Sequence, residues 1–432
     1  MILANGTVYE TTEQNRLLDT LEEQINTTRA TRSLQAETVI RAVEQLRRQV
    51  LDGAFTEQIT ALLTDSPEQY LTLAADFMDG NNLRYRLSRE LGVDFAPTKH
   101  ITPPYGVSGA TVRYMPLGTL FHIAAGNMDG LPAFSVLEGL LTGNVNILKL
   151  PQADNGLTVE ILRALIAIEP TLAPFIYVFD TPSSDVAAMK RMAEMSDGIV
   201  VWGGDGAVSA VRTLAPTGAK LIEWGHKLGF AYISDYENKD AELQALADHI
   251  LESRQLLCSS CQTVYLDTES MDAVRDFCHE FLPYLDKAAR KYPIREVGAV
   301  AEMTLRRYTE RLEHTVGGQS TSDGRETFQG SSVSLTACTD SELELSYMYG
   351  NPLVKRLPQK DLLPTLRRAK GTLQTAGLLC PPDRRTALSD LLARAGVDRI
   401  MRAGHMSVTF CGEAHDGEYP LRRYTRVVNI ED

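Results

Sequence analysis

The amino-acid sequence predicts an α/β fold built on a parallel sheet with helices on both faces. Between residues 119 and 222, short apolar runs alternate with segments whose apolar side chains recur at helical spacing. The runs are apolar almost throughout, which is typical of strands buried on both faces, and strands separated by helices favour parallel pairing. Ligands of such sheets bind beyond the carboxyl ends of the strands. The expected strands are residues 120–124, 145–150, 175–179, 199–202 and 220–222.

Residues 1–100 are expected to form a helical segment that packs against this sheet. Apolar side chains recur three or four residues apart with charged ones between them; the apolar positions are Val39, Val43, Leu46 and Val50. This spacing gives one buried helix face and one solvated, basic face. The stretch 97–109, with two adjacent prolines and two glycines, predicts a linker.

The tail from residue 406 alternates between polar and apolar side chains. The alternation predicts a β-hairpin with arms at 407–410 and 424–430 and a turn at 416–418. A terminal strand of this kind needs a partner sheet, and a second subunit is one source of it.

Composition limits the classes of function. A chain of 432 residues with 44% hydrophobic residues can bury two or three cores. Its formal charge of −13 argues against a general nucleic-acid or anionic-membrane binder. The six cysteines are scattered and no apolar leader opens the sequence, which indicates a reducing cytoplasm. No window reaches the roughly 18 apolar residues of a membrane span.

Cys258 is the first candidate for chemistry. A strand at 230–233 and a long helix at 240–257 lead to it, and a polar turn follows. A thiolate attacks thioesters and carbonyls and leaves again, which suits acyl transfer. Inert packing is the alternative for any single cysteine. The spacing to Cys261 also permits a redox dithiol or half a zinc site, although a second ligand pair at suitable spacing is missing.

Asn127 and Lys149 come at the ends of two expected strands. The amide of Asn127 can donate to a developing oxyanion, or serve only in a Gly-Asn turn. Lys149 can hold a ribose or a phosphate at the ligand edge of the sheet, or extend into solvent.

Two more strand ends carry candidate residues. Gly203 and Gly204 precede a helix whose N-terminus suits a pyrophosphate, although the full G-x-G-x-x-G pattern is absent. Asp205 would then be the N-cap of that helix. Glu223 follows apolar strand residues, so partial burial is expected to raise its pKa and make it a candidate general base; an ordinary surface carboxylate is the alternative.

The order of these residues along the chain resembles the aldehyde dehydrogenase superfamily. Within it, three segments resemble the acyl-CoA reductase family, which includes the LuxC fatty-acid reductase of bacterial luminescence. These segments are His122-Ile-Ala-Ala-Gly-Asn127, Trp202-Gly-Gly-Asp205 and Cys258-Ser-Ser260. The resemblance covers residues 110–270 best.

The resemblance implies an aldehyde-dehydrogenase-like fold with a Rossmann-like NAD(P)-binding domain. It further implies that Cys258 accepts the acyl group, that Asn127 and the Cys258 backbone N–H form the oxyanion hole, and that Glu223 is the general base. Lys149 would contact the adenosine ribose or its 2′-phosphate, and Gly203 and Gly204 would let the pyrophosphate approach. The expected domains are 1–100, helical; 101–229, NAD(P)-binding; 230–405, catalytic; and 406–432, a β tail for oligomerisation.

Two departures from the superfamily pattern bear on the cofactor. Many NAD-preferring relatives carry an acidic residue three positions after the lysine, where this chain has Gln152. Loss of that charge tolerates a 2′-phosphate, so NADP(H) is favoured without exclusion of NAD(H). The superfamily's Glu-x-Phe-Gly-Pro element has only a partial match at 347–352, which lacks the carboxylate unless Glu344 supplies it.

The resulting hypothesis is NADPH-dependent reduction of an acyl thioester, from acyl-CoA or an acyl carrier, to the aldehyde. The opposite direction uses the same groups: an aldehyde is oxidised with NAD(P) to the acyl-enzyme, which is released as acyl-CoA or is hydrolysed to the acid by water that Glu223 activates. Reduction of an acyl phosphate is a third version. A catalytically silent relative of the fold is a further alternative. The expected partners are the acyl thioester, a second copy in a homodimer or homotetramer, and an acyl-transferring enzyme.

Overall fold

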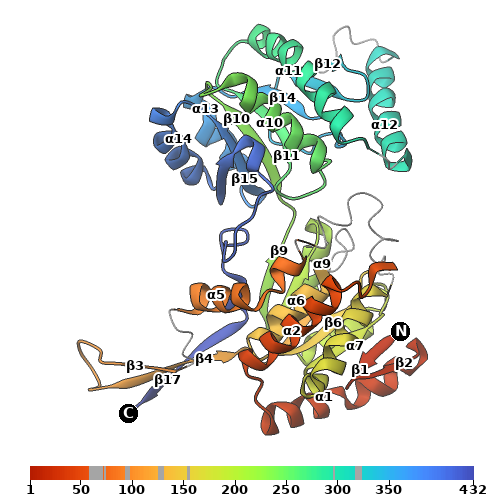
Figure 1. Cartoon of the computed structure of the whole chain (residues 1–432), viewed down its shortest axis with the longest axis vertical. Helices are drawn as coiled ribbons and strands as arrows, with labels where there is room; N and C mark the ends of the chain where they lie inside the picture. Colours follow the sequence, from red (N-terminus) through yellow and green to blue (C-terminus); the bar gives the residue numbers. More distant parts are fainter. Residues whose placement is uncertain are drawn as a thin grey trace. The chain divides into compact units, whose positions relative to one another are not determined.

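The computed structural model describes residues 1–57, 72, 74–92, 98–124, 131–152, 156–294, 297–316 and 324–432. The chain folds into two compact units (Figure 1). The first comprises Met1–Gly225 together with Phe410–Asp432, and the second comprises His226–Thr409. The chain therefore leaves the first unit at the end of one strand and returns to it near the C-terminus.

A seven-stranded sheet forms the centre of the first unit, in the order β2-β1-β7-β6-β5-β8-β9. Its five parallel strands are β5 (Thr119–Ile123), β6 (Val145–Lys149), β7 (Ile176–Phe179), β8 (Gly198–Trp202) and β9 (Lys220–Trp224). Most of their side chains are buried, as expected for a sheet covered on both faces. The five strands and their parallel pairing confirm the prediction.

Helices cover this sheet on both faces. On one side α2 packs with α6 and α7, and on the other α1 packs with α8. The helices of this unit are α1 (Gln14–Thr31), α2 (Ala36–Leu51), α5 (Gly80–Leu91), α6 (Leu131–Leu141), α7 (Leu157–Ile168), α8 (Val186–Glu194), α9 (Asp205–Leu214) and α15 (Pro420–Arg423), with 3-10 turns η1 (Thr11–Glu13) and η3 (Pro170–Phe175). The predicted apolar face of α2 is buried.

The N-terminal hundred residues are not entirely helical. Two short strands, β1 (Ile2–Ala4) and β2 (Thr7–Tyr9), form a hairpin that pairs antiparallel with β7 and extends the sheet. Three residues per strand are too few for an alternating pattern to be recognised, and the turn at Asn5-Gly6, with φ of 49° and 77°, is the one local signal.

A separate three-stranded sheet corrects two expectations. It has the order β17-β4-β3, formed by β3 (Thr98–Ile101), β4 (Ala110–Pro116) and β17 (Thr425–Glu431). The predicted linker therefore includes a strand. The two predicted arms of the C-terminal hairpin do not pair, although the predicted turn is present, closed by backbone bonds between His415 and Glu418 at 2.8 and 2.9 Å. The second arm, β17, pairs antiparallel with β4 of its own chain along seven residues, whereas the first arm is not a strand. Alternation shows that a strand has two faces but not where its partner lies.

The second unit holds another seven-stranded sheet, in the order β12-β13-β14-β11-β10-β15-β16. Only the β12–β13 pair is antiparallel. The strands are β10 (Leu228–Ile233), β11 (Cys261–Leu266), β12 (Arg325–Gln329), β13 (Ser334–Cys338), β14 (Leu353–Arg356), β15 (Leu373–Leu379) and β16 (Arg399–Arg402).

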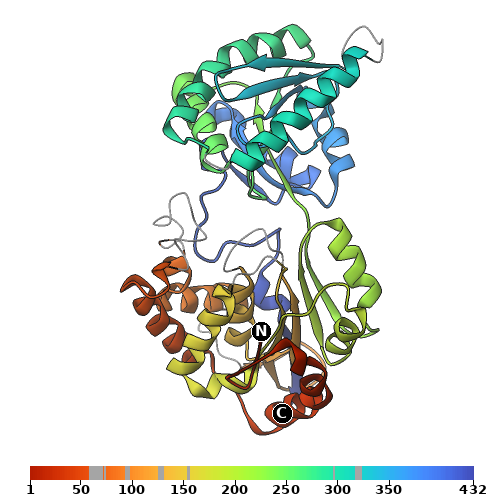
Figure 2. The same cartoon turned by 90° about the vertical axis from the view of Figure 1, so that its right-hand side faces the viewer.

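Two separate cores flank this second sheet. Helices α10 and α11 pack on one face and α13 and α14 on the other (Figures 1 and 2). The helices are α10 (Lys239–Glu252), α11 (Met271–Lys291), α12 (Val297–Val316), α13 (Gln359–Leu366) and α14 (Pro382–Ala395), with 3-10 turns η4 (Arg367–Ala369) and η5 (Ala403–His405).

Helix α10 ends earlier than predicted. The sequence suggested a helix to residue 257, but α10 stops at Glu252, and the next residues include Arg254 and Gln255 with φ of 51° and 61°. These left-handed conformations are incompatible with a continuing right-handed helix. The apolar residues that extended the helical pattern, Leu256 and Leu257, are exposed.

Candidate functional site

Cys258 lies in a tight turn between α10 and β11. Backbone bonds close the turn from Leu256 N to Ser253 O at 3.0 Å and from Ser260 N to Leu257 O at 2.9 Å. The Ser260 hydroxyl accepts a further bond from Leu257 N at 3.1 Å. Cys258 is exposed, whereas Cys261, the first residue of β11, is fully buried. The turn thus presents one thiol at the surface and removes the other from it.

A buried glutamine connects this turn to a second loop. The side chain of Gln255 is 1% exposed, and its amide nitrogen donates to Cys261 O at 2.8 Å and to Ser346 Oγ at 3.0 Å. Its amide oxygen accepts from the backbone N–H groups of Gly350 and Asn351 at 3.0 and 3.1 Å. All four hydrogen-bonding positions of this amide are therefore used within the protein.

Gln262 completes the connection from β11. Its amide nitrogen donates to the Gln255 carbonyl at 2.7 Å, and its amide oxygen accepts from the Ser346 hydroxyl at 2.7 Å. Ser346 in turn accepts from Met348 N at 3.0 Å. We call Gln255, Gln262 and Ser346 the amide clamp. Because a satisfied buried network has few alternative arrangements, the clamp fixes the Cys258 turn against residues 346–351.

Close approach to β10 also shapes the turn. A Cβ on Gly229 would lie 2.6 Å from Ser260 O and 2.7 Å from Ser259 O, so only glycine permits this approach. The pairing of β10 with β11 shifts register between Gly229 and Phe230. The irregularity coincides with the point where the turn enters β11.

His249, on α10, supports the far side of the turn. Its Nε2 accepts from Cys261 N at 3.3 Å, so its hydrogen is on Nδ1, which faces the Ser407 hydroxyl at 3.4 Å. Burial lowers the pKa of His249 to about 4, with a further contribution from Arg399. His249 is therefore a neutral structural group at physiological pH.

The redox and metal interpretations of the Cys258–Cys261 pair receive no support. Burial raises the pKa of Cys261 to about 12, which disfavours the thiolate that a metal or an exchange reaction needs. Among the described residues, the one group with metal-ligating geometry is Cys338, Asp340 and Glu344, remote in sequence from this pair.

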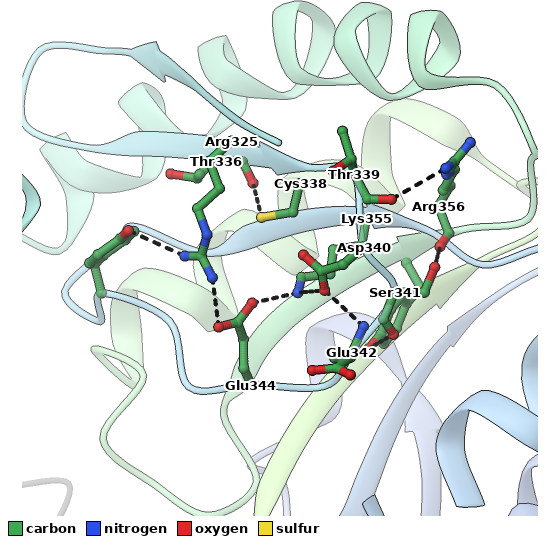
Figure 3. Close-up of polar contacts among 12 residues, drawn as sticks. Arg325, Thr336, Cys338, Thr339, Asp340, Ser341, Glu342, Glu344, Lys355 and Arg356 are labelled. Atoms are coloured by element: carbon green, nitrogen blue, oxygen red, sulfur yellow. Dashed lines mark hydrogen bonds and ion pairs between the residues drawn. The ribbon is translucent and has the colours of Figure 1, made fainter. Parts of the chain in front are cut away.

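That acidic group is already neutralised by a buried lysine (Figure 3). The Lys355 ammonium, with a fully buried side chain, contacts Asp340 at 2.6 Å and Glu344 at 2.5 Å. Glu344 also accepts from Arg325 at 2.7 Å. Glu344 is the residue that could supply the missing carboxylate of the partial Glu-x-Phe-Gly-Pro match at 347–352. In the structure, both of its carboxylate oxygens contact cations of the second unit.

The first unit contains the residues expected to hold a cofactor. Lys149 is the last residue of β6 and is 5% exposed; burial lowers its pKa, with Asp180 acting in the opposite direction. Gln152 lies three residues after Lys149 and is exposed. Asn127 lies outside the described residues.

Gly203 and Gly204 connect β8 to α9. Gly203 N donates to Trp224 O at 3.1 Å, and Gly204 is the N-cap residue of α9. The expectation that Asp205 caps the helix is wrong, because Asp205 is already the first helical residue. A Cβ on Gly204 would meet nothing within 4 Å, so the backbone there is open to a close ligand.

A buried hydrogen-bond chain fixes the residue before this glycine pair. The Trp202 indole N–H donates to Ser135 Oγ at 3.2 Å, which leaves the Ser135 hydrogen for His122 Nδ1 at 2.7 Å. His122 Nε2 therefore donates to Asn146 Oδ1 at 3.0 Å. Burial lowers the pKa of His122 to about 4. A Cβ on Gly139 would lie 1.8 Å from the Asn146 oxygen, so glycine is required there.

The expected rise in the pKa of Glu223 is wrong. Arg212 on α9 donates to both carboxylate oxygens, at 2.5 and 2.7 Å, and this contact lowers the pKa despite partial burial of the carboxylate. The sequence showed the apolar strand before Glu223 but not the arginine that faces it from the preceding helix.

The sequence analysis named Trp202 only as part of the 202–205 segment and did not single out the residues that surround it. Trp202 and Trp224 stack with ring centres 5.4 Å apart, and His415 lies 4.9 Å from Trp224. Arg423 places its guanidinium 4.9 Å from the Trp224 ring centre and donates to Leu221 O at 3.1 Å. Their long sequence separation hides this cluster. Gln255, three residues before Cys258, was the nearest local signal for the amide clamp.

Comparison with known families identifies one match along most of the chain. The acyl-CoA reductase (LuxC) family model matches residues 32–427. Similar proteins include the long-chain acyl-protein thioester reductase 2 of Photobacterium leiognathi, 23% identical over 329 residues, and the long-chain acyl-protein thioester reductase of Aliivibrio fischeri, 24% identical over 330 residues. Each alignment covers 74% of this chain and 65% of the relative, so the chain spans slightly under two thirds of these relatives' length.

Solved structures share the fold at low sequence identity. Aldehyde dehydrogenase 21 from Physcomitrella patens, in complex with succinate, matches with a TM-score of 0.72 at 12% identity, covering 98% of this chain and 90% of its own. The NADP-dependent glyceraldehyde-3-phosphate dehydrogenase from Bacillus halodurans, in complex with NADP, matches with a TM-score of 0.72 at 14% identity, covering 100% and 98%. The fold is therefore aldehyde-dehydrogenase-like, as the sequence predicted.

Within the described ranges, no helix combines the length and apolar character needed to cross a bilayer.

Replacing Gln255 with leucine should disrupt the Cys258 turn. The change removes the side-chain acceptor of the Gly350 N–H, one of two acceptors of the Asn351 N–H, and the side-chain donor to the Cys261 carbonyl. We therefore expect a loss of about 2–4 kcal/mol in the free energy of unfolding. Denaturant titration measures this loss, and mass-mapped iodoacetamide labelling reports an altered rate at Cys258. Gln244→Leu on α10 is the matched control, because the Gln244 amide donates one bond, to Asp248. Equal effects of the two changes would contradict the clamp.

The buried imidazole of His122 should be visible in the pH dependence of stability. Its folded pKa of about 4 lies below the ordinary value of about 6.5, so only the unfolded state binds a proton between these pH values. The wild type therefore loses about 3 kcal/mol from this residue as pH falls from 6.5 to 4, and His122→Gln does not. We expect the difference in unfolding free energy between the two proteins to shrink by that amount. A difference independent of pH would contradict a neutral His122.

Proposed function

Because the chain belongs to the acyl-CoA reductase (LuxC) family, we propose that it reduces an acyl thioester to the aldehyde with NADPH, through an acyl group held on Cys258. The observation that carries the proposal is the family match over residues 32–427, together with the exposed Cys258 on a turn fixed by buried hydrogen bonds. The names of the relatives favour a long-chain acyl group on a protein thiol as substrate, alongside acyl-CoA.

In the proposed reaction the Cys258 thiolate adds to the thioester carbonyl carbon. The bond from that carbon to the sulfur of CoA or of a carrier breaks, the released thiolate takes up a proton, and the acyl group remains on Cys258. The Asn127 amide and the Cys258 backbone N–H stabilise the charge on the carbonyl oxygen. Hydride addition to the acyl carbon would leave a thiohemiacetal anion on Cys258, and this anion would expel the Cys258 thiolate and release the aldehyde. The clamp residue Gln255 holds the turn through these steps.

Cofactor binding is assigned to the first unit. Lys149 at the end of β6 would hold the adenosine ribose or its 2′-phosphate, and Gly203 and Gly204 would admit the pyrophosphate at the N-terminus of α9. The open space beside Gly204 fits this use. When bound, the nicotinamide supplies hydride to the acyl carbon. Gln152, uncharged and exposed, favours NADP(H) and does not exclude NAD(H).

Oxidation of an aldehyde to the acid is the alternative direction. It requires Glu223 to activate water against the acyl-enzyme, and the contact of both Glu223 oxygens with Arg212 weighs against that role. A catalytically silent relative is a further alternative, and an unreactive Cys258 thiol would favour it. A homodimer or homotetramer, an acyl-transferring partner enzyme and a cytoplasmic location stay predictions from the sequence.

Cys258→Ala should abolish aldehyde formation from palmitoyl-CoA and NADPH, because the acyl group then has no acceptor. Gas chromatography of the aldehyde and release of free CoA measure the two halves of the reaction. Cys411→Ala is the matched control, since Cys411 is a partly exposed thiol of the first unit. Aldehyde production by Cys258→Ala at the wild-type rate would overturn the assignment.

Gln152→Glu should shift cofactor preference from NADPH toward NADH. A carboxylate at this exposed position repels a 2′-phosphate, and we expect the ratio of kcat/KM for NADPH over NADH to fall by about tenfold. Gln152→Ala, which adds no charge, should keep the wild-type ratio. If Gln152→Glu also keeps it, Gln152 does not lie near the 2′-phosphate.

A further inference from the structure

One loop of the second unit is bound at two places. It comprises residues 339–352 and joins β13 to β14. Its first part binds the ammonium of Lys355, on β14 (Figure 3). Its last part, 346–351, binds the Gln255 amide and so lies against the Cys258 turn. The loop therefore connects a buried cation to the candidate nucleophile, and all of these residues belong to the second unit.

Lys355 binds two residues of this loop at once. It is the third residue of β14, and its fully buried side chain places the ammonium 2.6 Å from Asp340 and 2.5 Å from Glu344. Burial acts to raise the pKa of Asp340, but the contact with Lys355 outweighs burial and the pKa is lowered, so this carboxylate is ionised. Arg325 of β12 donates to the other oxygen of Glu344 at 2.7 Å. The first part of the loop is thus held by charge to two strands of the sheet.

The other place of contact has a costly backbone. Met348 and Tyr349 have φ of 56° and 48°, and the residues they meet, Arg254 and Gln255, have φ of 51° and 61°. Tyr349 N donates to Arg254 O at 3.0 Å across this junction. These are four of the seven non-glycine residues with positive φ in the described part of the chain. Left-handed conformations of such residues persist only where the surroundings hold them.

Stability alone gives little reason for a buried lysine here. Removal of an ammonium from water costs free energy that contacts with carboxylates offset only in part, and apolar side chains of similar size often replace such ion pairs without loss of stability. The carboxylates of Asp340 and Glu344 are 44% and 35% exposed, so they could be solvated without Lys355. What the buried ammonium adds is a fixed point to which two loop residues must return.

We propose that Lys355 is a positioning residue for Cys258. Its two carboxylate contacts hold the 339–352 loop in the conformation that binds Gln255, and the Gln255 amide fixes the turn that carries the thiol. The inference rests on the proposed function in one respect, namely that Cys258 accepts the acyl group. It assigns a role in the reaction to an ion pair that acts through a loop and a buried amide.

Hydrogen exchange in the full-length protein tests whether the ion pair reaches the turn. Lys355→Met removes the ammonium and keeps a long, unbranched side chain. Exchange of the backbone amides in two segments, 253–262 and 339–352, is measured by mass spectrometry. We expect both segments to exchange about tenfold faster than in the wild type, because the loop loses its anchor and the turn then loses the loop. Faster exchange in 339–352 with unchanged exchange in 253–262 would overturn the inference.

A second variant removes the same ion pair from the loop side. Asp340→Asn combined with Glu344→Gln changes two partly exposed side chains, and it decides the outcome alone if Lys355→Met does not fold. Addition of Lys355→Met to this double variant should accelerate exchange in 253–262 no further, because the contact is already lost. Lys360→Met, which removes an exposed pair with Glu269 in the same unit, should leave both segments unchanged.

Acylation kinetics separate positioning from a general loosening of the unit. CoA release in the first turnover is followed across palmitoyl-CoA concentrations. In Lys355→Met the maximal rate constant should fall about tenfold, because a displaced thiol meets the carbonyl in a poor geometry, while the half-saturating concentration stays within about twofold. A wild-type maximal rate constant would overturn the inference and leave the proposed function intact. Absence of a first turnover in the wild type would overturn the proposed function, and the exchange measurement would then decide by itself whether Lys355 fixes the turn.

Discussion

The Gln255 amide is the interaction on which the candidate nucleophile turn depends. Its amide nitrogen donates to the Cys261 carbonyl and the Ser346 hydroxyl, and its amide oxygen accepts from the N–H groups of Gly350 and Asn351. Both connected segments contain residues in left-handed conformation, including Gln255 itself and Met348. Such conformations cost free energy, and the buried bonds offset it. The position of Cys258 therefore results from tertiary contacts, not from helix geometry.

Each of the two units contains a network of buried polar side chains that bind one another. In the first, the chain from Trp202 through Ser135 and His122 to Asn146 is buried and directional, and it fixes an indole beside the Gly203–Gly204 pair. In the second, the buried Lys355 ammonium contacts Asp340 and Glu344, and Glu344 belongs to the 341–352 segment. A buried polar group is tolerated only where its partners are fixed, so these networks mark the segments with the least freedom to move.

The parallel sheet of the first unit could be predicted from the sequence, whereas the side-chain and backbone contacts around it could not. Continuous apolar runs such as 145–149 specify buried parallel strands without reference to the rest of the chain. The end of α10, the partner of β17 and the pKa of Glu223 depend on residues distant in sequence or on backbone conformations that composition does not encode. Leu256 and Leu257 extended the helical pattern although neither is buried. Asn127, a central candidate, lies outside the described residues, so its role stays a prediction.

The placement of β17 has a consequence for the order of synthesis. The strand pairs with β4, and Asn144 donates to the Tyr424 carbonyl at 3.0 Å, so the first unit needs residues from both ends of the chain. All of the second unit lies between them, at His226–Thr409. On the ribosome, the second unit, with the Cys258 turn, is therefore fully translated while the first still lacks a strand. A nascent chain at that stage exposes the free edge of β4, which is the kind of edge that chaperones protect and aggregates exploit.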